Sequence, residues 1–366
     1  MSRKMTAYRM IDWEKPPQMV EVNVPQPGPG EMLVKVAGNG LCHSDLVMGM
    51  IPETFGQMNG WNMPFTLGHE IGGWIEDLGA GVDGFSIGDP VALVTPQSCG
   101  TCSYCLRGHD NCCERSLAGR GYGRDGGLAQ YVCVRGTREV IKLNTIDPMT
   151  AGPLTDAGAT SYHAVKRILP RLYPGTTAVV IGAGGLGSFA VQFLRILSPA
   201  RVVAVDTNPA RLDFATEIGA HEALNGITVS TAQEILELTK GQGAAAVLDF
   251  VGIDETIEAG LASVRKAGAF ALVGAGGGTL NQPWYLSLPK DAEVFTFQGG
   301  TITDTHEVLA LAETGLIRNE IDVFPLSRVA EAYEKLDRGE LRGLLEHLVR
   351  HHLAQFRQSR AAPDVP

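Results

Sequence analysis

The sequence lacks a long apolar run and lacks any surplus of positive charge. A transmembrane helix needs about 20 consecutive apolar residues, and the 366-residue sequence contains no such run. The N-terminus is not followed by an apolar h-region, so no secretory signal is predicted. A formal net charge of −10 would repel the phosphates of nucleic acids. We therefore expect a cytoplasmic protein that binds neither membranes nor nucleic acids.

Helical periodicity is scarce in the N-terminal part of the chain. Apolar runs at 32–36 and 90–94 are bounded by Gly and Pro, which predicts short strands of a small, partly open barrel. After Pro153, strand-like runs alternate with helical segments, which predicts a parallel, doubly wound sheet and an α/β fold. We expect a β-rich domain over 1–154, completed by 299–366, and a nucleotide-binding domain over 155–298. The strands of that sheet are expected at 177–181, 201–206, 245–251, 270–274 and 294–297.

A glycine pattern follows the first of these strands and opens a helix. The residues are Gly182, Ala183, Gly184, Gly185, Leu186 and Gly187. In the G-x-G-x-x-G pattern, Gly182 permits a tight turn, Gly184 lets a pyrophosphate approach the backbone, and Gly187 allows close helix–strand packing. The helix N-terminus then offers free N–H groups to the phosphates. The pattern predicts a dinucleotide site along this segment, including Gly185 and Leu186.

Asp206 ends the next predicted strand. A carboxylate there can accept hydrogen bonds from the adenosine ribose and would repel the extra phosphate of NADP, so NAD is the predicted cofactor. The alternative is that Asp206 only caps the helix that begins at Pro209, or a turn. Arg211 is a further candidate for the adenosine end of the site.

Five of the seven cysteines lie close together in a polar loop, and four of them are candidate ligands: Cys99, Cys102, Cys105 and either Cys112 or Cys113. In a reducing compartment such crowding indicates metal binding before disulfides. Four thiolates at short spacing suit a closed, tetrahedral, structural zinc site. An iron–sulfur cluster or free thiols are the alternatives. Cys133 lies in an apolar run and is expected to be a small buried side chain.

A second group of metal-ligand residues is spread along the chain. Cys42 follows a strand, and His69 and Glu70 begin a Gly-rich stretch. A Cys, a His and a carboxylate can together hold zinc and leave one position for substrate. The spacing alone does not bring Cys42 to His69, and each of them separately is more often ordinary structure.

The segment Gly68-His69-Glu70-Ile71-Gly72-Gly73, with Gly79 and Val82 following, resembles the zinc signature of the medium-chain alcohol dehydrogenases. Cys42, the four-cysteine loop and the glycine pattern occur in that family's order and at its distances. The resemblance extends from about residue 31 to about residue 342. Residues 153–158, Pro-Leu-Thr-Asp-Ala-Gly, are most similar to the bacterial secondary-alcohol branch. The resemblance implies a Rossmann domain beside a GroES-like catalytic domain, with NAD and two zinc ions per chain.

The resemblance also implies which residues hold the two ions. The catalytic zinc would lie on Cys42, His69 and Asp156, with Glu70 beside it. The family spacing favours Cys113 over Cys112 as the fourth ligand of the structural zinc. The alternative for Asp156 is an N-cap of a helix over 157–166.

The segment after Cys42 would handle the cofactor and the proton. By the resemblance, His43 contacts the cofactor pyrophosphate and Ser44 accepts the proton of the alcohol. The alternative for Ser44 is a turn serine bonded to the backbone. The family's relay histidine is replaced by Val47, so the later path would use ribose and water, or His43.

Four aromatic residues are candidates for the substrate pocket: Phe55, Trp61, Trp284 and Tyr285. An apolar pocket would favour hydrophobic alcohols, although each residue fits equally well in a core or a subunit contact.

The expected activity is reversible hydride transfer between a primary or secondary alcohol and NAD, giving an aldehyde or ketone. A related dehydrogenase of a polyol or an aldehyde adduct is the alternative, and a non-catalytic NAD- or zinc-binding sensor is the third reading. We expect a homodimer or homotetramer, and a solvated terminal helix around His347, His351 and His352.

Overall fold

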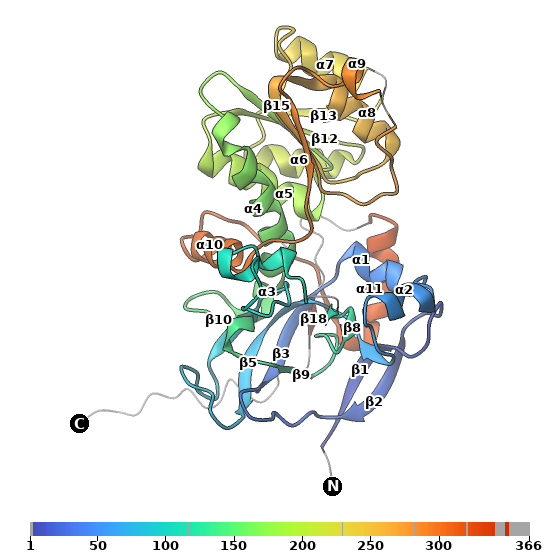
Figure 1. Cartoon of the computed structure of the whole chain (residues 1–366), viewed down its shortest axis with the longest axis vertical. Helices are drawn as coiled ribbons and strands as arrows, with labels where there is room; N and C mark the ends of the chain where they lie inside the picture. Colours follow the sequence, from blue (N-terminus) through green and yellow to red (C-terminus); the bar gives the residue numbers. More distant parts are fainter. Residues whose placement is uncertain are drawn as a thin grey trace, which may run out of the picture.

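The structure is a computed structural model, and it describes residues 3–115, 118–228, 230–281, 283–319, 321–340 and 348–350. Figure 1 shows an α/β half above a β-rich half, with helices crossing between them. Among the described residues, no helix combines the length and the apolar character that a membrane crossing requires.

The α/β half is built on a six-stranded sheet of order β13-β12-β11-β14-β15-β16. All neighbouring strands pair in parallel, which confirms the predicted doubly wound sheet. The central strand β11 (Thr177–Ile181) is buried throughout, as expected for a strand covered by helices on both faces. The other strands are β12 (Arg201–Asp206), β13 (Glu222–Asn225), β14 (Ala244–Asp249), β15 (Val264–Leu272) and β16 (Glu293–Thr296). The covering helices are α5 (Gly185–Leu197), α6 (Pro209–Glu217), α7 (Thr231–Leu238), α8 (Asp254–Ser263) and α9 (Trp284–Ser287).

The β-rich half contains an antiparallel five-stranded sheet of order β10-β6-β5-β3-β9. Its central strands β3 (Met32–Gly40) and β5 (Glu70–Leu78) bury Val34, Val36 and Ile71 in one apolar cluster. The remaining strands of this sheet are β6 (Pro90–Leu93), β9 (Tyr131–Val134) and β10 (Val140–Lys142). A three-stranded sheet is formed by β2 (Gln18–Asn23), β1 (Lys4–Met10) and β4 (Phe65–Thr66), and β7 (Gly119–Arg120) pairs with β8 (Gly123–Arg124). The short helices of this half are α1 (His43–Met48), α2 (Glu53–Met58), η1 (Cys105–Arg107), η2 (Asp110–Cys112) and η3 (Thr137–Glu139).

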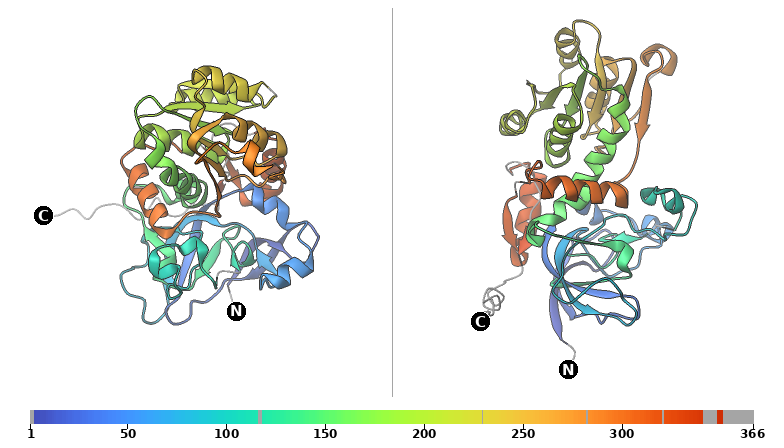
Figure 2. Two further views of the ribbon diagram at one scale, coloured as in Figure 1. Left: turned by 45° about the horizontal axis from the view of Figure 1, so that its top comes forward. Right: turned by 90° about the vertical axis from the view of Figure 1, so that its left-hand side faces the viewer.

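One continuous helical run leads from the β-rich half into the α/β half. It consists of α3 (Pro148–Pro153), the π-helical turn η4 (Leu154–Gly158), α4 (Ala159–Ile168) and η5 (Leu169–Arg171). After β16 the chain returns through α10 (Ile302–Glu313), which Figure 2 shows at the waist between the two halves. The return segment packs on the helical run, since α10 contacts both η4 and α4. The domain boundaries given above stay a prediction.

The C-terminal segment closes the β-rich half. It contains η6 (Leu326–Arg328) and α11 (Val329–Asp337), and Figure 1 shows α11 beside α1 and α2. The strand β17 (Val323–Pro325) pairs in parallel with β18 (Leu348–Arg350). The expected terminal helix is therefore wrong for residues 348–350, because the backbone there is hydrogen-bonded to a neighbouring strand. His347, His351 and His352 lie outside the described residues.

Candidate active site

Four side chains with metal-ligating atoms meet at the end of β3 and β5. One ligand atom from each of Cys42, His69, Glu70 and Asp156 lies within 4.8 Å of the others. His69 Nε2 lies 3.3 Å from Asp156 Oδ2. Cys42 is the N-cap of α1, Glu70 begins β5, and Asp156 lies in η4. The structure thus brings together all the residues predicted for the catalytic zinc, and a sulfur, a nitrogen and carboxylate oxygens form a donor set that zinc accepts.

Glycines make this close approach possible. A Cβ atom on Gly40 would lie 1.9 Å from Oε2 of Glu70, and one on Gly152 would lie 2.2 Å from the backbone oxygen of Glu70. Gly68 has a positive φ of 91°, which places the turn before His69 in a conformation that favours glycine. The backbone of β3, β5 and α3 can therefore pack around Glu70 only because these positions carry no side chain.

Asp156 occupies a π-helical turn, where the helical run is locally wider than an α-helix. Such turns occur frequently at functional sites. The N-cap of α3 is Asp147, whose side chain accepts a hydrogen bond from Met149, and the N-cap of α4 is Gly158. The alternative that Asp156 caps a helix over 157–166 is therefore wrong, since its carboxylate faces His69 instead.

The buried charges of the cluster stabilise one another. Burial alone would raise the pKa of Asp156, but hydrogen bonding to His69 and the charge of that ring lower it. Burial alone would likewise lower the pKa of His69, but Tyr122, Asp45 and Asp156 raise it well above its usual range. Both shifts favour the charged forms, a carboxylate on Asp156 and an imidazolium on His69. A metal ion would replace the proton on Nε2 of His69, so metal binding should release a proton.

Two residues of the cluster were not found from the sequence. Asp45 is buried, and its Oδ1 lies 3.3 Å from Nδ1 of His69, the arrangement in which a carboxylate orients a metal-binding imidazole. Its position three residues after Cys42, where it accepts a hydrogen bond from the Cys42 N–H at 3.1 Å, is a capping pattern that the sequence offered. Tyr122 is the second residue, and no spacing in the sequence links it to Cys42 or His69.

The Tyr122 hydroxyl joins Ser44 to the cluster. It lies 2.6 Å from Oγ of Ser44 and 3.3 Å from Nε2 of His69. Gly121 and Gly123 on either side have positive φ values of 75° and 81°, so the chain turns sharply around the tyrosine. Ser44 is therefore not the backbone-bonded turn serine of the alternative, because its side chain is hydrogen-bonded to Tyr122.

A cavity of about 530 Å³ lies between Cys42 and the glycine pattern. From the β-rich half it is lined by Leu41, Cys42 and His43. From the α/β half it is lined by the glycine segment, Asp206, Thr207 and Arg211, with Ile227, Val251 and Glu255 further along. The volume falls in the range of small-molecule and cofactor sites. The predicted nucleotide residues and Cys42, a predicted metal ligand, therefore face one shared space.

The glycine segment has the geometry that its pattern predicts. Gly182 has a φ of 85°, and a Cβ atom on Gly187 would lie 1.8 Å from the backbone oxygen of Gly182. Oδ2 of Asp206 accepts a hydrogen bond from the Ala183 N–H at 2.8 Å, so the carboxylate braces the turn. Asn208, not Asp206, is the N-cap of α6, but Oδ1 of Asp206 accepts a hydrogen bond from the Asn208 N–H at 2.8 Å, as the alternative of a turn residue expects.

Two basic side chains lie near this carboxylate and Cys42. Arg211 Nη1 is 3.9 Å from Oδ2 of Asp206 and faces Gly184. His43 follows Cys42 at the cavity wall, and partial desolvation together with the charge of Arg211 lowers its pKa. His43 is therefore mainly neutral at pH 7, and Arg211 is the cationic side chain beside Asp206.

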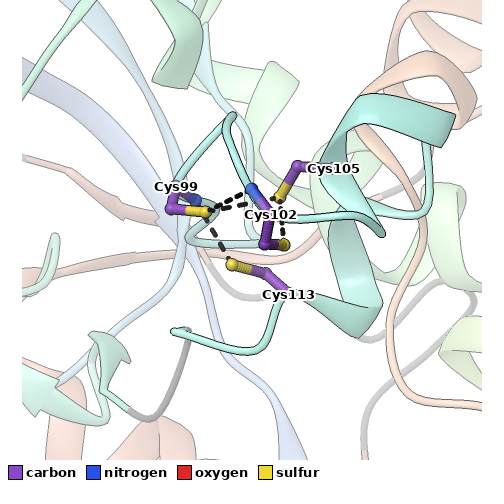
Figure 3. A group of neighbouring side chains, drawn as sticks. All are labelled: Cys99, Cys102, Cys105 and Cys113. Atoms are coloured by element: carbon purple, nitrogen blue, oxygen red, sulfur yellow. Dashed lines mark hydrogen bonds between the residues drawn. The ribbon is translucent and has the colours of Figure 1, made fainter.

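The four-cysteine loop forms a separate cluster, which Figure 3 shows with its sulfur atoms turned toward one centre. Sγ of Cys105 lies 3.9 Å from Sγ of Cys99 and 3.5 Å from Sγ of Cys102. Four sulfurs about 2.3 Å from a tetrahedral zinc would be separated by about 3.8 Å, so the cluster fits the ion. Cys113 belongs to the group and is buried, whereas Cys112 is exposed.

Backbone N–H groups also favour thiolates in this loop. Thr101, through its hydroxyl and its N–H, and Cys102, through its N–H, donate to Sγ of Cys99. These hydrogen bonds lower the pKa of Cys99 to about 5. Burial and the neighbouring sulfur atoms raise the pKa of Cys105 to about 12, so the backbone favours a thiolate at Cys99 but not at every position of the loop.

The four aromatic candidates separate into two pairs. The Trp61 ring lies 5.9 Å from Phe55 and 6.1 Å from Tyr122, whose ring is 4.9 Å from His69. Trp284 and Tyr285 contact each other edge to face on α9 and are 71% and 77% exposed. None of the four lines the 530 Å³ cavity. Only the first pair is connected to the metal cluster through neighbouring rings, and the pocket assignment of all four stays a prediction.

Comparison with known proteins gives matches over nearly the whole chain. Residues 28–145 match the family model "Alcohol dehydrogenase GroES-like domain", and residues 185–314 match "Zinc-binding dehydrogenase". A NAD-dependent alcohol dehydrogenase of Sulfurisphaera tokodaii is 33% identical over 339 residues, which are 91% of this chain and 96% of that protein. A D-arabinose 1-dehydrogenase (NADP(+)) of Saccharolobus solfataricus is 30% identical over 93% of this chain and 96% of that protein. The crystal structure of an alcohol dehydrogenase from Aeropyrum pernix superposes with a TM-score of 0.87 at 33% identity, covering 94% of this chain and 100% of that one.

Proposed function

Because the chain belongs to the zinc-dependent medium-chain alcohol dehydrogenase family, we propose that it interconverts a hydrophobic primary or secondary alcohol and its carbonyl product. The observation that carries the proposal is the shared cavity. Cys42, one of the clustered ligands, lines the same space as the glycine segment and Asp206. A substrate oxygen at the metal would thus be next to a dinucleotide, as hydride transfer requires.

Each partner of the reaction has residues suited to hold it. Zinc, when bound, supplies a Lewis acid that lowers the pKa of an alcohol oxygen, and NAD supplies the hydride acceptor. Cys42, His69 and Asp156 hold the ion, with Glu70 beside it. The N–H groups at the start of α5 bind the pyrophosphate, together with His43. Asp206 and Arg211 hold the adenosine ribose.

Ser44 is the acceptor we propose for the alcohol proton. Its Oγ lies 2.6 Å from the Tyr122 hydroxyl, which holds the serine beside His69. Val47 carries no group that could pass the proton onward, so His43 or solvent in the cavity would complete the path. His43 suits this role because its lowered pKa keeps the imidazole able to accept a proton near pH 7.

The substrate class rests on the apolar rings near the metal cluster. Phe55 and Trp61 would give a pocket that favours hydrophobic alcohols. A polyol or sugar is the second candidate, supported by the resemblance to a D-arabinose dehydrogenase. A carboxylate at Asp206 favours NAD over the NADP used by that relative.

We also propose two zinc ions per chain, a homodimer or homotetramer, and a cytoplasmic location. The two ligand clusters support the metal count. Cysteines must stay reduced in order to bind zinc, which supports the cytoplasm.

A substrate panel tests the proposed activity. Purified protein is assayed with primary, secondary, alicyclic and aryl alcohols and with pentoses, each with NAD and NADP, and reduced cofactor is followed by its absorbance. We expect the highest kcat/KM for a hydrophobic alcohol with NAD. Higher kcat/KM for a pentose would support the second candidate, and no turnover by the zinc-loaded protein with any alcohol would refute the proposal.

A further inference from the structure

The side chain of Tyr333 reaches the metal cluster from the C-terminal segment. Tyr333 lies on α11, whose buried face consists of Val329, Ala332, Tyr333 and Leu336. These positions recur at helical spacing, so one stripe of α11 packs into the β-rich half. The stripe shares an apolar cluster with Leu41, Met48, Phe65 and Leu67. The ring is 6% exposed, and its position is therefore fixed by packing.

The Tyr333 hydroxyl ends in a hydrogen bond to a buried carboxylate. It donates to Oδ2 of Asp45 at 2.9 Å, across 288 positions of sequence. The same Oδ2 accepts the Cys42 N–H at 3.1 Å. The other oxygen, Oδ1, lies 3.3 Å from Nδ1 of His69. One carboxylate thus joins the C-terminal helix, the backbone of one proposed ligand and the ring of another.

Two donors on one oxygen restrict how Asp45 can turn. Asp45 is 2% exposed, so rotating its carboxylate would leave buried polar groups without partners, which costs roughly 1–3 kcal/mol for each group. Burial raises the pKa of Tyr333, so its hydroxyl keeps the proton that it donates. With Oδ2 held, Oδ1 has a fixed direction toward the His69 ring.

We propose that Tyr333 is a positioning residue of the catalytic metal centre: by holding Asp45, it fixes the orientation in which His69 presents Nε2 to the ion. The proposal rests on the proposed function, because it assumes that the Cys42, His69 and Asp156 cluster binds zinc. It gives α11 a role that its distance in sequence from the ligands does not indicate. Groups that orient a metal-binding histidine typically change metal affinity by about 10–100-fold when removed.

A neighbouring tyrosine provides the matched control. The Tyr8 ring stacks on Tyr333 with centroids 6.1 Å apart and an interplanar angle of 24°. Within the described part of the chain, the Tyr8 hydroxyl has no hydrogen bond to a metal-site residue. Tyr8→Phe therefore removes the same atom from the same aromatic pair without touching Asp45.

The experiment measures release of zinc from the holoprotein to a colorimetric chelator. The variants are Tyr333→Phe, Tyr8→Phe, Asp45→Asn and the double variant Tyr333→Phe/Asp45→Asn. In Tyr333→Phe we expect the catalytic zinc to leave about tenfold faster, while zinc of the cysteine loop leaves at the wild-type rate. Tyr8→Phe should match the wild type. Because Tyr333 acts through Asp45, the double variant should be no faster than Asp45→Asn alone.

Activity gives a second readout. Excess zinc in the assay should restore the kcat of Tyr333→Phe, and the KM for NAD should not change, since Tyr333 does not line the cavity. Wild-type zinc release from a folded Tyr333→Phe protein would overturn the proposal. If that variant does not fold, wild-type release from Asp45→Asn would overturn it equally, since no connection to His69 would remain. A wild-type protein with no zinc at Cys42 would instead contradict the proposed function itself.

Discussion

The two ligand clusters are assembled in opposite ways. The cysteine loop takes four ligands of one kind from residues 99–113, all on one loop. The catalytic cluster takes a thiolate, an imidazole and two carboxylates from three segments, up to Asp156 in the π-helical turn. Closing a short loop costs little conformational entropy, so the first site needs only local sequence. The second needs the packing of both halves of the molecule.

The two clusters are also expected to have different roles, one in the stability of the fold and the other in the reaction. Four sulfurs around one centre leave no position for a substrate, whereas the mixed cluster borders the cofactor cavity through Cys42. Changes in the loop should therefore affect folding, and changes in the mixed cluster should affect turnover. The following experiments test that separation.

The largest effect is expected from His69→Ala. Removing the imidazole should release the catalytic zinc and lower kcat/KM by about 1000-fold or more, because a Lewis acid contributes several kcal/mol. Zinc measured by mass spectrometry should fall from two ions to one, and NAD binding should be retained. Near-wild-type turnover in this variant would contradict a role in turnover for the mixed cluster, and with it the proposed difference between the two clusters.

Cys102→Ser should lower the stability of the protein and leave its turnover nearly unchanged. Loss of a ligand from the closed site should lower the free energy of unfolding by roughly 3 kcal/mol, while kcat of the folded protein stays within about threefold. Denaturant unfolding and a kinetic assay on the same sample measure both. Cys112→Ser, an exposed neighbour outside the group, should change stability by no more than about 0.5 kcal/mol. Equal destabilisation by the two variants would count against the cysteine cluster as a metal site.

Asp304→Asn tests the packing that the catalytic cluster needs. Asp304, on α10, is 2% exposed and its Oδ2 lies 2.7 Å from Nδ1 of His163, on the helix that continues from Asp156. Burial alone would raise the pKa of Asp304, but hydrogen bonds from His163 and Thr301 lower it from 3.8 to about 2. The variant should lose about 2 kcal/mol of stability at pH 7.

The pH dependence of that loss has a defined sign. A carboxylate with a lowered folded-state pKa stabilises the protein fully above its unfolded pKa, and the contribution disappears as the pH falls through the folded pKa. The difference in free energy of unfolding between the wild type and Asp304→Asn should therefore be constant above about pH 5 and should become smaller between pH 4 and pH 2. Denaturant unfolding at several pH values measures this difference. A difference that increases toward acid pH would contradict the lowered pKa of Asp304.

The smallest effect is expected from Asp206→Asn. The amide keeps an acceptor for the Ala183 N–H but removes the charge that would repel the phosphate of NADP. The ratio of kcat/KM for NAD to that for NADP should fall by about tenfold, which is 1.4 kcal/mol. Zinc content should stay unchanged at both clusters. An unchanged cofactor ratio would assign Asp206 only to the turn that it braces.

Local patterns in the sequence predicted much of this molecule. The parallel sheet is confirmed, and Gly182 and Gly187 have the backbone geometry that their pattern requires. The four sulfurs lie together as their spacing suggested. For the glycine pattern and the cysteine loop the information lies within about 15 residues, and for the sheet it lies in the alternation of strands and helices after Pro153.

Local sequence patterns could not predict the contacts between distant segments. Cys42 and His69 were associated only through family resemblance, and Asp45 and Tyr122 were not foreseen at all. Tyr333 meets Asp45 across 288 positions, and nothing in a single sequence marks that pair. The edge strand β13 and the strand β18 were missed because edge pairing depends on a neighbour from elsewhere in the chain.

Anomalous X-ray diffraction at the zinc edge, on crystals of active protein, tests the central claim most directly. The account predicts two peaks in each chain. One lies among the sulfurs of the cysteine loop, and the other lies between Sγ of Cys42, Nε2 of His69 and the carboxylate of Asp156. An active protein with a single peak, in the cysteine loop alone, would contradict it.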